Sequence, residues 1–466
     1  MKYLTLRTRV SWGAVALVLL MIAVLAVIAQ TRGVPTLTNI VLSGLTLAAL
    51  YFLVASGLSL IFGLMDVLNF AHGSIFMIGA YIGYTLFDRS GVLLTGLPLL
   101  LGLLAGLFVA PLVKIPGFLK KRGIAVVSLV LAVVVALLSV REWESGASLA
   151  RLLGGVLSGA FFGLSAAVGG ERPRNQVSRP ASAGVWAGPL ILLGLALFIT
   201  WQQAPLSQAI IGLDSNWRFA LALVIGTLSG GLLGALIEWS LIRPLYARPI
   251  FQVLMTLGLA FVLNEVVRAL WGPAGFSMAR PELFDQNCRA ATLLDWAVNH
   301  CSRIDMLGRP FPTYRLFIIV VGLAIALIVA LVLQRSRLGM IIRAGVQDAE
   351  MVQALGINVR QVFTLVFAAG AALAALGGVI AAPFLGVYTD MGLEFQLQGF
   401  IAVVIGGMGS YVGAFVGAIV LGMARAFGDY FALKLQLSPT IAEASTVIIM
   451  IIVLLLRPQG LFGKKD

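Results

Sequence analysis

Long apolar stretches recur along almost the whole chain, and they constrain its fold more than any other feature. An α-helix needs roughly 20 mostly apolar residues to cross the hydrocarbon core of a bilayer. Of the 466 residues, 60% are hydrophobic and only 11% are charged. A soluble domain has about 25% charged residues and no interior that could hide so much apolar surface. The sequence therefore predicts an all-α polytopic membrane protein.

The apolar stretches predict about 12–14 transmembrane segments, some of them broken or re-entrant. Two neighbours, 395–407 and 411–428, are short for a straight crossing and could be half-helices or a re-entrant pair. Such breaks survive only where protein or a water-filled cavity surrounds them. The fourteen candidate segments are 12–30, 40–63, 67–88, 92–113, 123–140, 151–169, 184–201, 217–240, 251–271, 314–334, 361–384, 395–407, 411–428 and 443–457.

Basic residues cluster between these segments and predict the orientation of the chain. The chain has 32 Lys and Arg against 19 Asp and Glu, and loops that stay in the cytoplasm collect such residues. Fourteen crossings place every basic cluster inside, so both termini are predicted to be cytoplasmic. Segment 12–30 could instead be a cleaved signal peptide, because Lys2, Arg7 and Arg9 precede an apolar run. No aromatic residues interleave the clusters, so no nucleic-acid partner is expected.

A long loop predicted to lie outside, 272–313, holds both cysteines of the chain. In an oxidising compartment Cys288 and Cys301 could close a disulfide, which would stabilise the fold by about 3 kcal/mol. Two unpaired thiols are the alternative, and the sequence leaves both open. His300 is adjacent, but no fourth ligand stands at zinc spacing, so no metal site is predicted.

A polar stretch with glycine at both ends interrupts the apolar runs between residues 63 and 73. Polar groups at membrane depth are costly and usually face a bundle interior or a transport pathway. Glycine permits a backbone break, whose freed polar groups a nearby side chain can satisfy. Two interpretations stay open, a tie that holds the break together and the wall of a pathway. The residues concerned are Asn69, Phe70, Ala71, His72 and Gly73.

A glycine-rich stretch near the C-terminus is predicted to be a turn followed by a closely packed helix. Gly406 and Gly407 lie where the chain should turn, and Gly409, Gly413 and Gly417 repeat on one helical face. Small residues on one face let another membrane helix approach closely. This pattern indicates packing around a pathway. No G-x-x-x-x-G-K-[ST] motif occurs in the sequence, so this motif gives the chain no ATPase of its own.

The cytoplasmic loop 335–360 is predicted to contain a short capped helix. Asp348 is a good N-cap and Gly356 a good C′ residue, and about two helical turns lie between them. Such a helix is marginal alone, so it either enters the groove of a partner protein or lies on the bilayer surface. Its predicted apolar face consists of Met351, Val352 and Leu355.

Several stretches in a fixed order also carry a family resemblance. They are Gly44–Gly63, Asn69–Gly73 with Gly79–Tyr81, Arg243–Leu245, the loop 337–358, Gly406–Ser410 and Arg457–Gly463. In this combination the chain resembles the branched-chain amino acid permeases of ABC importers, on their LivH-like side. The resemblance covers roughly 40–88 and 217–466.

The resemblance implies a transport subunit of a bacterial plasma (inner) membrane rather than an enzyme. Its expected partners are a second, LivM-like permease subunit, two cytoplasmic ATPases, an extracytoplasmic solute-binding protein and membrane lipid. No cofactor is expected on the chain itself, because the ATPases use the ATP. The resemblance assigns coupling to the ATPases to Arg343, Ala344, Asp348, Met351, Leu355, Gly356 and Ile357.

Three regions are predicted along the chain. Residues 1–88 form N-terminal membrane segments with the broken-helix motif. Residues 89–216 form inserted extra transmembrane segments, since LivH-like permeases have a much shorter connection there. Residues 217–466 form a C-terminal permease core that includes the outer loop 272–313 and the coupling loop 335–360.

Other functions remain open. Urea and short amides rival branched-chain amino acids as substrates, because nothing in the sequence identifies a pair of groups that would bind a zwitterion. An ion-coupled secondary transporter would use His72, Glu265 or Asp66 for its coupling ion. Glu265 and Arg268, three residues apart on a helix, could instead simply pair with each other. A membrane-embedded enzyme lacks any nucleophile–base or metal constellation.

Overall fold

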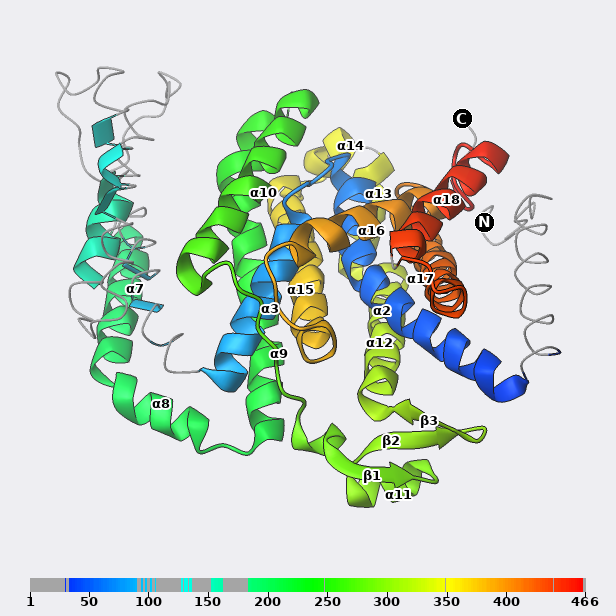
Figure 1. Ribbon diagram of the computed structural model, residues 1–466. Helices are drawn as coiled ribbons and strands as arrows, with labels where there is room; N and C mark the ends of the chain where they lie inside the picture. The colour runs from blue at the N-terminus through cyan, green and yellow to red at the C-terminus, as the bar shows by residue number, and fades with distance from the viewer. Residues whose placement is uncertain are drawn as a thin grey trace. The chain divides into compact units, whose positions relative to one another are not determined.

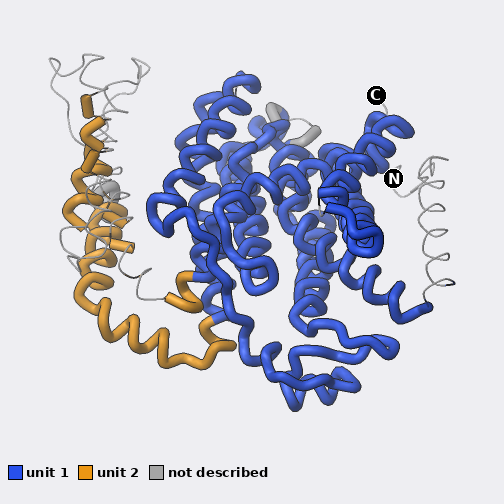
Figure 2. The backbone as a smooth tube through the Cα atoms, viewed as in Figure 1, with its two compact units in different colours: residues 1–84, 219–466 blue, residues 85–218 orange. Residues whose placement is uncertain are grey.

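The computed structural model describes residues 33–89, 152–161, 183–246, 248–347, 349–438 and 440–463, with isolated positions between 30 and 135. The predicted segments 12–30, 92–113 and 123–140 lie outside the described residues, apart from isolated positions, and so does the end of 151–169. The chain divides into two compact units, Met1–Tyr84 with Phe219–Asp466 and Thr85–Arg218 (Figure 2).

The first unit is a bundle of membrane-spanning helices (Figure 1). Six helices in the described residues are long and apolar enough to cross a membrane. The number rises to seven if the bent helix pair of the second unit, Gly188–Trp201 with Gln203–Ile211, counts as one span. This confirms the predicted polytopic helical fold. The six are α2 (Val34–Met65), α9 (Ser215–Ile237) with its continuation to Leu245, α10 (Pro249–Trp271), α12 (Thr313–Arg335), α15 (Val359–Leu385) and α17 (Tyr411–Lys434). The shorter helices of this unit include α3 (His72–Asp88), α16 (Met391–Gly406) and α18 (Thr440–Leu456).

Helix α2 lies at the centre of this bundle. It packs against α12, α15, α16 and α17, and 72% of its most apolar window is buried, against 11% for α12. Because all faces of both helices are apolar, this difference separates a helix enclosed by the rest of the chain from one whose apolar surface the described chain leaves largely uncovered. Helix α15 approaches its neighbours closely through small buried residues, namely Gly370, Ala371, Ala374, Ala375, Gly377 and Gly378.

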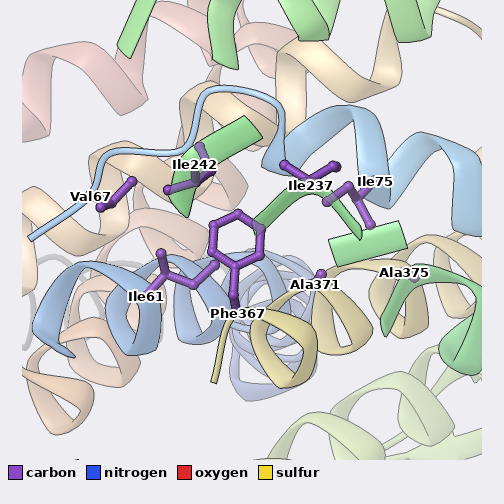
Figure 3. Packing of buried hydrophobic residues seen from close by; sticks show 8 residues of the cluster. All are labelled: Ile61, Val67, Ile75, Ile237, Ile242, Phe367, Ala371 and Ala375. Carbon is purple, nitrogen blue, oxygen red and sulfur yellow. The ribbon is translucent and has the colours of Figure 1, made fainter. Parts of the chain in front are cut away.

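A buried hydrophobic cluster joins α2, α3, α9 and α15 at one end of this bundle. The ring of Phe367 lies among isoleucine side chains from the other elements (Figure 3). Branched and aromatic side chains fill this space without polar atoms, so the helix ends are fixed relative to one another. The members of the cluster are Ile61, Val67, Ile75, Ile237, Ile242, Phe367, Ala371 and Ala375.

Helix α17 runs further than the sequence indicated. The apolar stretch was predicted to stop at 428, before the charges of Asp429 and Lys434, but the helix continues to Lys434. Arg425 lies 3.4 Å from Asp429, which follows one turn later, so the two side chains form an ion pair along the helix. With 24 residues, α17 is long enough to cross the membrane, whereas α16, with 16 residues, is short.

The loop 272–313 folds into a small sheet, so the helical prediction does not extend to it. Strands β1 (Gln286–Ala290), β2 (Cys301–Met306) and β3 (Arg309–Pro312) pair in that order, β1 with β2 in parallel and β2 with β3 antiparallel. Helix α11 (Leu293–Asn299) connects β1 to β2. Leu307 and Gly308 both have positive φ, the backbone that a two-residue hairpin requires.

The second unit contains α7 (Ala183–Trp201) and α8 (Gln203–Ile211). The two helices bend by 70° at Gln202, and together they form the bent pair. A hydrophobic cluster holds α7 and α8 to earlier parts of the unit through Leu94, Leu101, Leu152, Ala196 and Ile199.

Candidate functional site

The broken-helix motif is an irregular segment between α2 and α3. Helix α2 ends at Met65, Asp66 adopts a left-handed backbone with φ 52°, and α3 begins only at His72. The backbone groups between them are buried and need partners other than water. One partner is local, because the N–H of Ala71 donates to Oδ1 of Asn69 at 3.0 Å.

Two distant helices supply the remaining partners of this segment. Gln396 of α16 accepts a hydrogen bond from the Gly73 N–H at 2.6 Å and donates to the Asn69 carbonyl at 3.3 Å. Thr256 of α10 accepts from the Phe70 N–H at 3.2 Å. The sequence analysis missed both residues, although a glutamine within an apolar stretch was a usable signal. In the structure the hydrogen bonds of this segment join α3, α10 and α16.

His72 is fully buried in packed protein. Within the described part of the chain neither ring nitrogen meets hydrogen-bond geometry, although the backbone of Val54 lies beside the ring. The ring lies against α2, since a Cβ at Gly57 would be 2.6 Å from Nε2. The other two residues suggested for a coupling ion lie elsewhere: Asp66 is an exposed helix cap, and Glu265 is exposed and pairs with Arg268 at 3.1 Å.

Replacing Gln396 by alanine is expected to destabilise the protein by about 2 kcal/mol. The change leaves the buried N–H of Gly73 without an acceptor, and an orphaned buried donor costs about 1–3 kcal/mol. Unfolding of the detergent-purified protein, followed by fluorescence, measures the effect. Gln361→Ala is the control because the Gln361 side chain is exposed. Equal stability of the two variants would show that the tie is not formed.

The glycine turn joins α16 to α17 and receives the C-terminal tail. Gly407 and Gly409 have φ of 102° and 77°, values that favour glycine. The N–H groups of Leu461 and Phe462 donate to the carbonyls of Ile405 and Gly406, both at 2.8 Å. Two stretches of the family resemblance, Gly406–Ser410 and Arg457–Gly463, therefore form one structural unit.

The cytoplasmic stretch folds as two short helices, α13 (Arg337–Gln347) and α14 (Ala349–Ala354). Asp348 lies outside the described residues. Gly356 has φ 83°, and the N–H of Ile357 donates to the Val352 carbonyl at 3.3 Å, which closes the C-terminus of α14. Arg343 donates to the carbonyl of Leu333 at the end of α12.

The apolar side chains of α14 divide between two faces. Val352 is 3% exposed and anchors the helix, whereas Met351 and Leu355 are 59% and 73% exposed. Consecutive helical residues are about 100° apart, while residues four apart share a face. Met351 and Leu355 therefore project together, so the predicted three-residue face is wrong for Val352. Ala344 of α13 is also exposed.

A buried ion pair lies where α9 passes into a π-helix, η3 (Glu238–Ile242). Glu238 is completely buried, and its Oε1 lies 3.4 Å from Nε of Arg243. Thr364, in the second turn of α15, donates to the other carboxylate oxygen at 2.5 Å. Burial raises the pKa of Tyr246, and its hydrogen bond to Glu238 raises it further. Tyr246 therefore stays protonated and acts as a third donor.

This ion pair joins the end of α9 to α15, the helix that follows α14. Arg243 also donates to Thr364 at 2.8 Å, so both charged residues contact α15. A shift of α14 would reach α15 directly, because only residues 355–358 separate the two helices. Glu238 was not among the residues predicted from the sequence to be functional.

The small sheet carries the two cysteines, and they are joined by a disulfide, with a Cα–Cα distance of 4.8 Å. It links β1 to the start of β2 across α11, beside the buried side chains of Ala290 and Ile304. The sheet precedes the N-terminal end of α12, and α13 follows its C-terminal end. Within the described ranges no three His, Cys, Asp or Glu residues are grouped so that they could hold a metal ion.

The spanning helices of the described residues define a multi-pass membrane protein. The chain matches the family "Branched-chain amino acid transport system / permease component" over residues 40–163 and 181–456, and it belongs to that family. The match runs through much of the region predicted to be an insertion, 89–216. No solved structure matches the chain.

Several bacterial permease proteins are similar to the chain. The high-affinity branched-chain amino acid transport system permease protein LivH of Escherichia coli K12 is 28% identical over 262 residues, 55% of this chain and 78% of LivH. LivH of Salmonella typhimurium LT2 gives the same values. BraD of Pseudomonas aeruginosa, a permease protein of the same kind of system, is 35% identical over 164 residues, 35% of this chain and 52% of BraD.

Proposed function

We propose that the chain is a permease subunit of an ABC importer for branched-chain amino acids and forms the translocation pathway with a second permease subunit. The family match over 40–163 and 181–456 carries this proposal, and the similar proteins belong to branched-chain amino acid transport systems. Two separate ATPases hydrolyse the ATP, and a solute-binding protein delivers the substrate. The exposed apolar side chains of α14 support the proposal, because an ATPase subunit needs a surface of the permease to bind.

The proposed orientation in the bacterial plasma membrane places the sheet outside and α13–α14 inside. A disulfide between Cys288 and Cys301 is typical of an oxidising compartment. Arg335, Arg337 and Arg343 near α13 are typical of a cytoplasmic loop. These two signals lie at opposite ends of α12 and agree with each other. On this orientation the C-terminus is also cytoplasmic.

A membrane-impermeant maleimide is expected to label the chain in intact bacterial cells only after an external reductant has been added. The two cysteines are the only ones in the sequence, and both are bonded, so labelling without reduction should be negligible. The double variant Cys288→Ser/Cys301→Ser provides the background. Labelling that requires broken cells would place the sheet on the cytoplasmic side.

Leu355→Asp is expected to abolish amino-acid uptake while leaving the permease folded. The side chain is 73% exposed, so the charge costs the free subunit little. In a contact with an ATPase groove the same carboxylate would be buried without a partner, which costs several kcal/mol. Co-purification of the ATPases with tagged permease measures the contact directly.

Leu294→Asp is the matched control for this experiment. Leu294 is 80% exposed on α11, in the sheet domain at the other end of the bundle. This variant should retain the ATPases and the uptake activity. ATPases that remain bound to Leu355→Asp, with normal uptake, would contradict the proposed role of α14.

A further inference from the structure

A cavity of about 1090 Å³ lies at the end of the bundle that carries the sheet. Its walls come from α2, α12, α17, α18 and the junction of α15 with α16, and Arg309 of β3 reaches its edge. A site of this size accepts a small solute together with water. The polar residues on which the inference depends are Arg315, Tyr388, Glu394 and Arg425.

One side of the cavity offers a cation without a carboxylate partner. Arg315 stacks on the ring of Phe384 at 4.6 Å, and its guanidinium donates to Ser43 Oγ at 3.4 Å. Among the described residues no Asp or Glu lies within ion-pair distance of it. The charged side chain that influences Arg315 electrostatically is a second cation, Arg280. A half-buried guanidinium in such surroundings favours an anion, above all a carboxylate.

Another part of the cavity wall offers acceptors. The hydroxyl of Tyr388 donates to Oε2 of Glu394 at 2.7 Å. Burial raises the pKa of Tyr388, and the hydrogen bond to Glu394 adds to the effect, so the tyrosine stays protonated and remains a donor. No Lys or Arg in the described chain pairs with Glu394. A carboxylate in this state favours an ammonium group.

Three other charged residues of the cavity form one ion-pair cluster. Arg425 lies 3.4 Å from Asp429 and 3.5 Å from Glu443, so the charge of Arg425 is compensated and the cluster keeps an excess of one carboxylate. Outside this cluster the charged residues lining the cavity are Arg309 at its edge, Arg315 and Glu394.

We propose that this cavity is a binding site for an α-amino acid zwitterion on its way through the permease. Arg315 binds the α-carboxylate, and Glu394 binds the ammonium group. The apolar surfaces of Phe384, Phe395 and Leu397 take the aliphatic side chain. A neutral solute such as urea carries no charge to pair with either group. The transport role of the site rests on the proposed function, but the binding does not.

Protection of a single cysteine tests this site. Both native cysteines are bonded, so Ala444→Cys introduces one free thiol into the cavity wall. In nanodiscs of the full permease pair, millimolar L-leucine should slow its reaction with a soluble maleimide. L-leucinamide lacks the carboxylate, isocaproate lacks the ammonium group, and urea lacks both, so none of the three should protect. In the Ala444→Cys background, Arg315→Gln should raise the half-protecting leucine concentration about 30-fold.

Two controls separate local protection from general effects. Ala297→Cys, on exposed α11 outside the cavity, should react at the same rate with or without leucine. Arg303→Gln, an exposed arginine of β2 that does not line the cavity, should leave protection unchanged. Protection that survives Arg315→Gln and Glu394→Gln would overturn the assignment.

Other outcomes identify a different occupant. Protection by urea but not by leucine would overturn the zwitterion site. Protection that follows phosphatidylethanolamine in the nanodisc, compared with an anionic phospholipid, and ignores leucine would show a lipid headgroup instead. If the complete importer takes up leucine but leucine never protects residue 444, this inference fails while the proposed function stands. If the importer fails to take up leucine although leucine protects, only the proposed function fails.

Discussion

Gly73→Val is expected to abolish the accumulation of folded protein. A Cβ at this position would lie 2.0 Å from the carbonyl oxygen of Gly392 and 2.6 Å from Cβ of Gln396. The first of these is a backbone atom of α16, so only a displacement of α3 or α16 would relieve the clash. Such a shift would also break the bond from the Gly73 N–H to Gln396. Closely packed interiors do not absorb displacements of this size.

Fluorescence-detected size-exclusion chromatography of a tagged chain measures this effect. The matched control is Gly258→Val in α10, another glycine within a spanning helix, where an added Cβ meets no atom within 4 Å. The control should elute as a single sharp peak, and Gly73→Val should be aggregated or absent. Similar peaks from both variants would mean that α3 and α16 are not in contact at this point.

Arg243→Ala should destabilise the protein by about 3 kcal/mol, the second large effect we expect. It leaves Glu238, whose side chain is completely buried, without its cation. Breaking a buried ion pair from one side costs about 3–5 kcal/mol, and the 28% exposure of Arg243 places the effect toward the lower limit. The unfolding midpoint of the detergent-purified protein measures it.

Two further variants decide whether the uncompensated charge is the cause. Arg268→Ala removes an arginine from exposed pairs with Glu265 and Asp390, so it should cost less than about 1 kcal/mol. The double variant Arg243→Ala/Glu238→Gln should recover much of the lost stability, because no charge is then left buried. A double variant no more stable than Arg243→Ala would attribute the loss to packing of the arginine side chain.

Length and apolarity alone predicted the spanning helices. A membrane helix makes its backbone hydrogen bonds within its own segment, so the local sequence is enough to identify it. Local chemistry also predicted the end of α14, where Gly356 adopts the positive φ expected of a C′ residue. The boundary of α17 was predicted too early, because an apolar stretch ends at the first charge whereas the helix continues past Asp429, which pairs with Arg425 at 3.4 Å.

The contacts that hold the centre together were beyond a local reading of the sequence. Gly73 and Gln396 are 323 positions apart, and no local sequence feature at either residue predicts the contact with the other. The same holds for the cavity, where Arg315 and Glu394 belong to different helices and neither is unusual in its own segment. The sheet was missed because short strands inside a polar loop lack the alternation that identifies a strand. Such features depend on tertiary packing.

The central claim is that this chain transports branched-chain amino acids only as part of an ATP-driven assembly. The direct test is uptake of labelled L-leucine into proteoliposomes that contain the chain, its partner permease and the two ATPases, with the solute-binding protein added outside. We predict uptake that requires ATP inside the vesicles and the binding protein outside, and that is lost with Leu355→Asp. Uptake by this chain alone, driven by a proton or sodium gradient without ATP, would contradict the account.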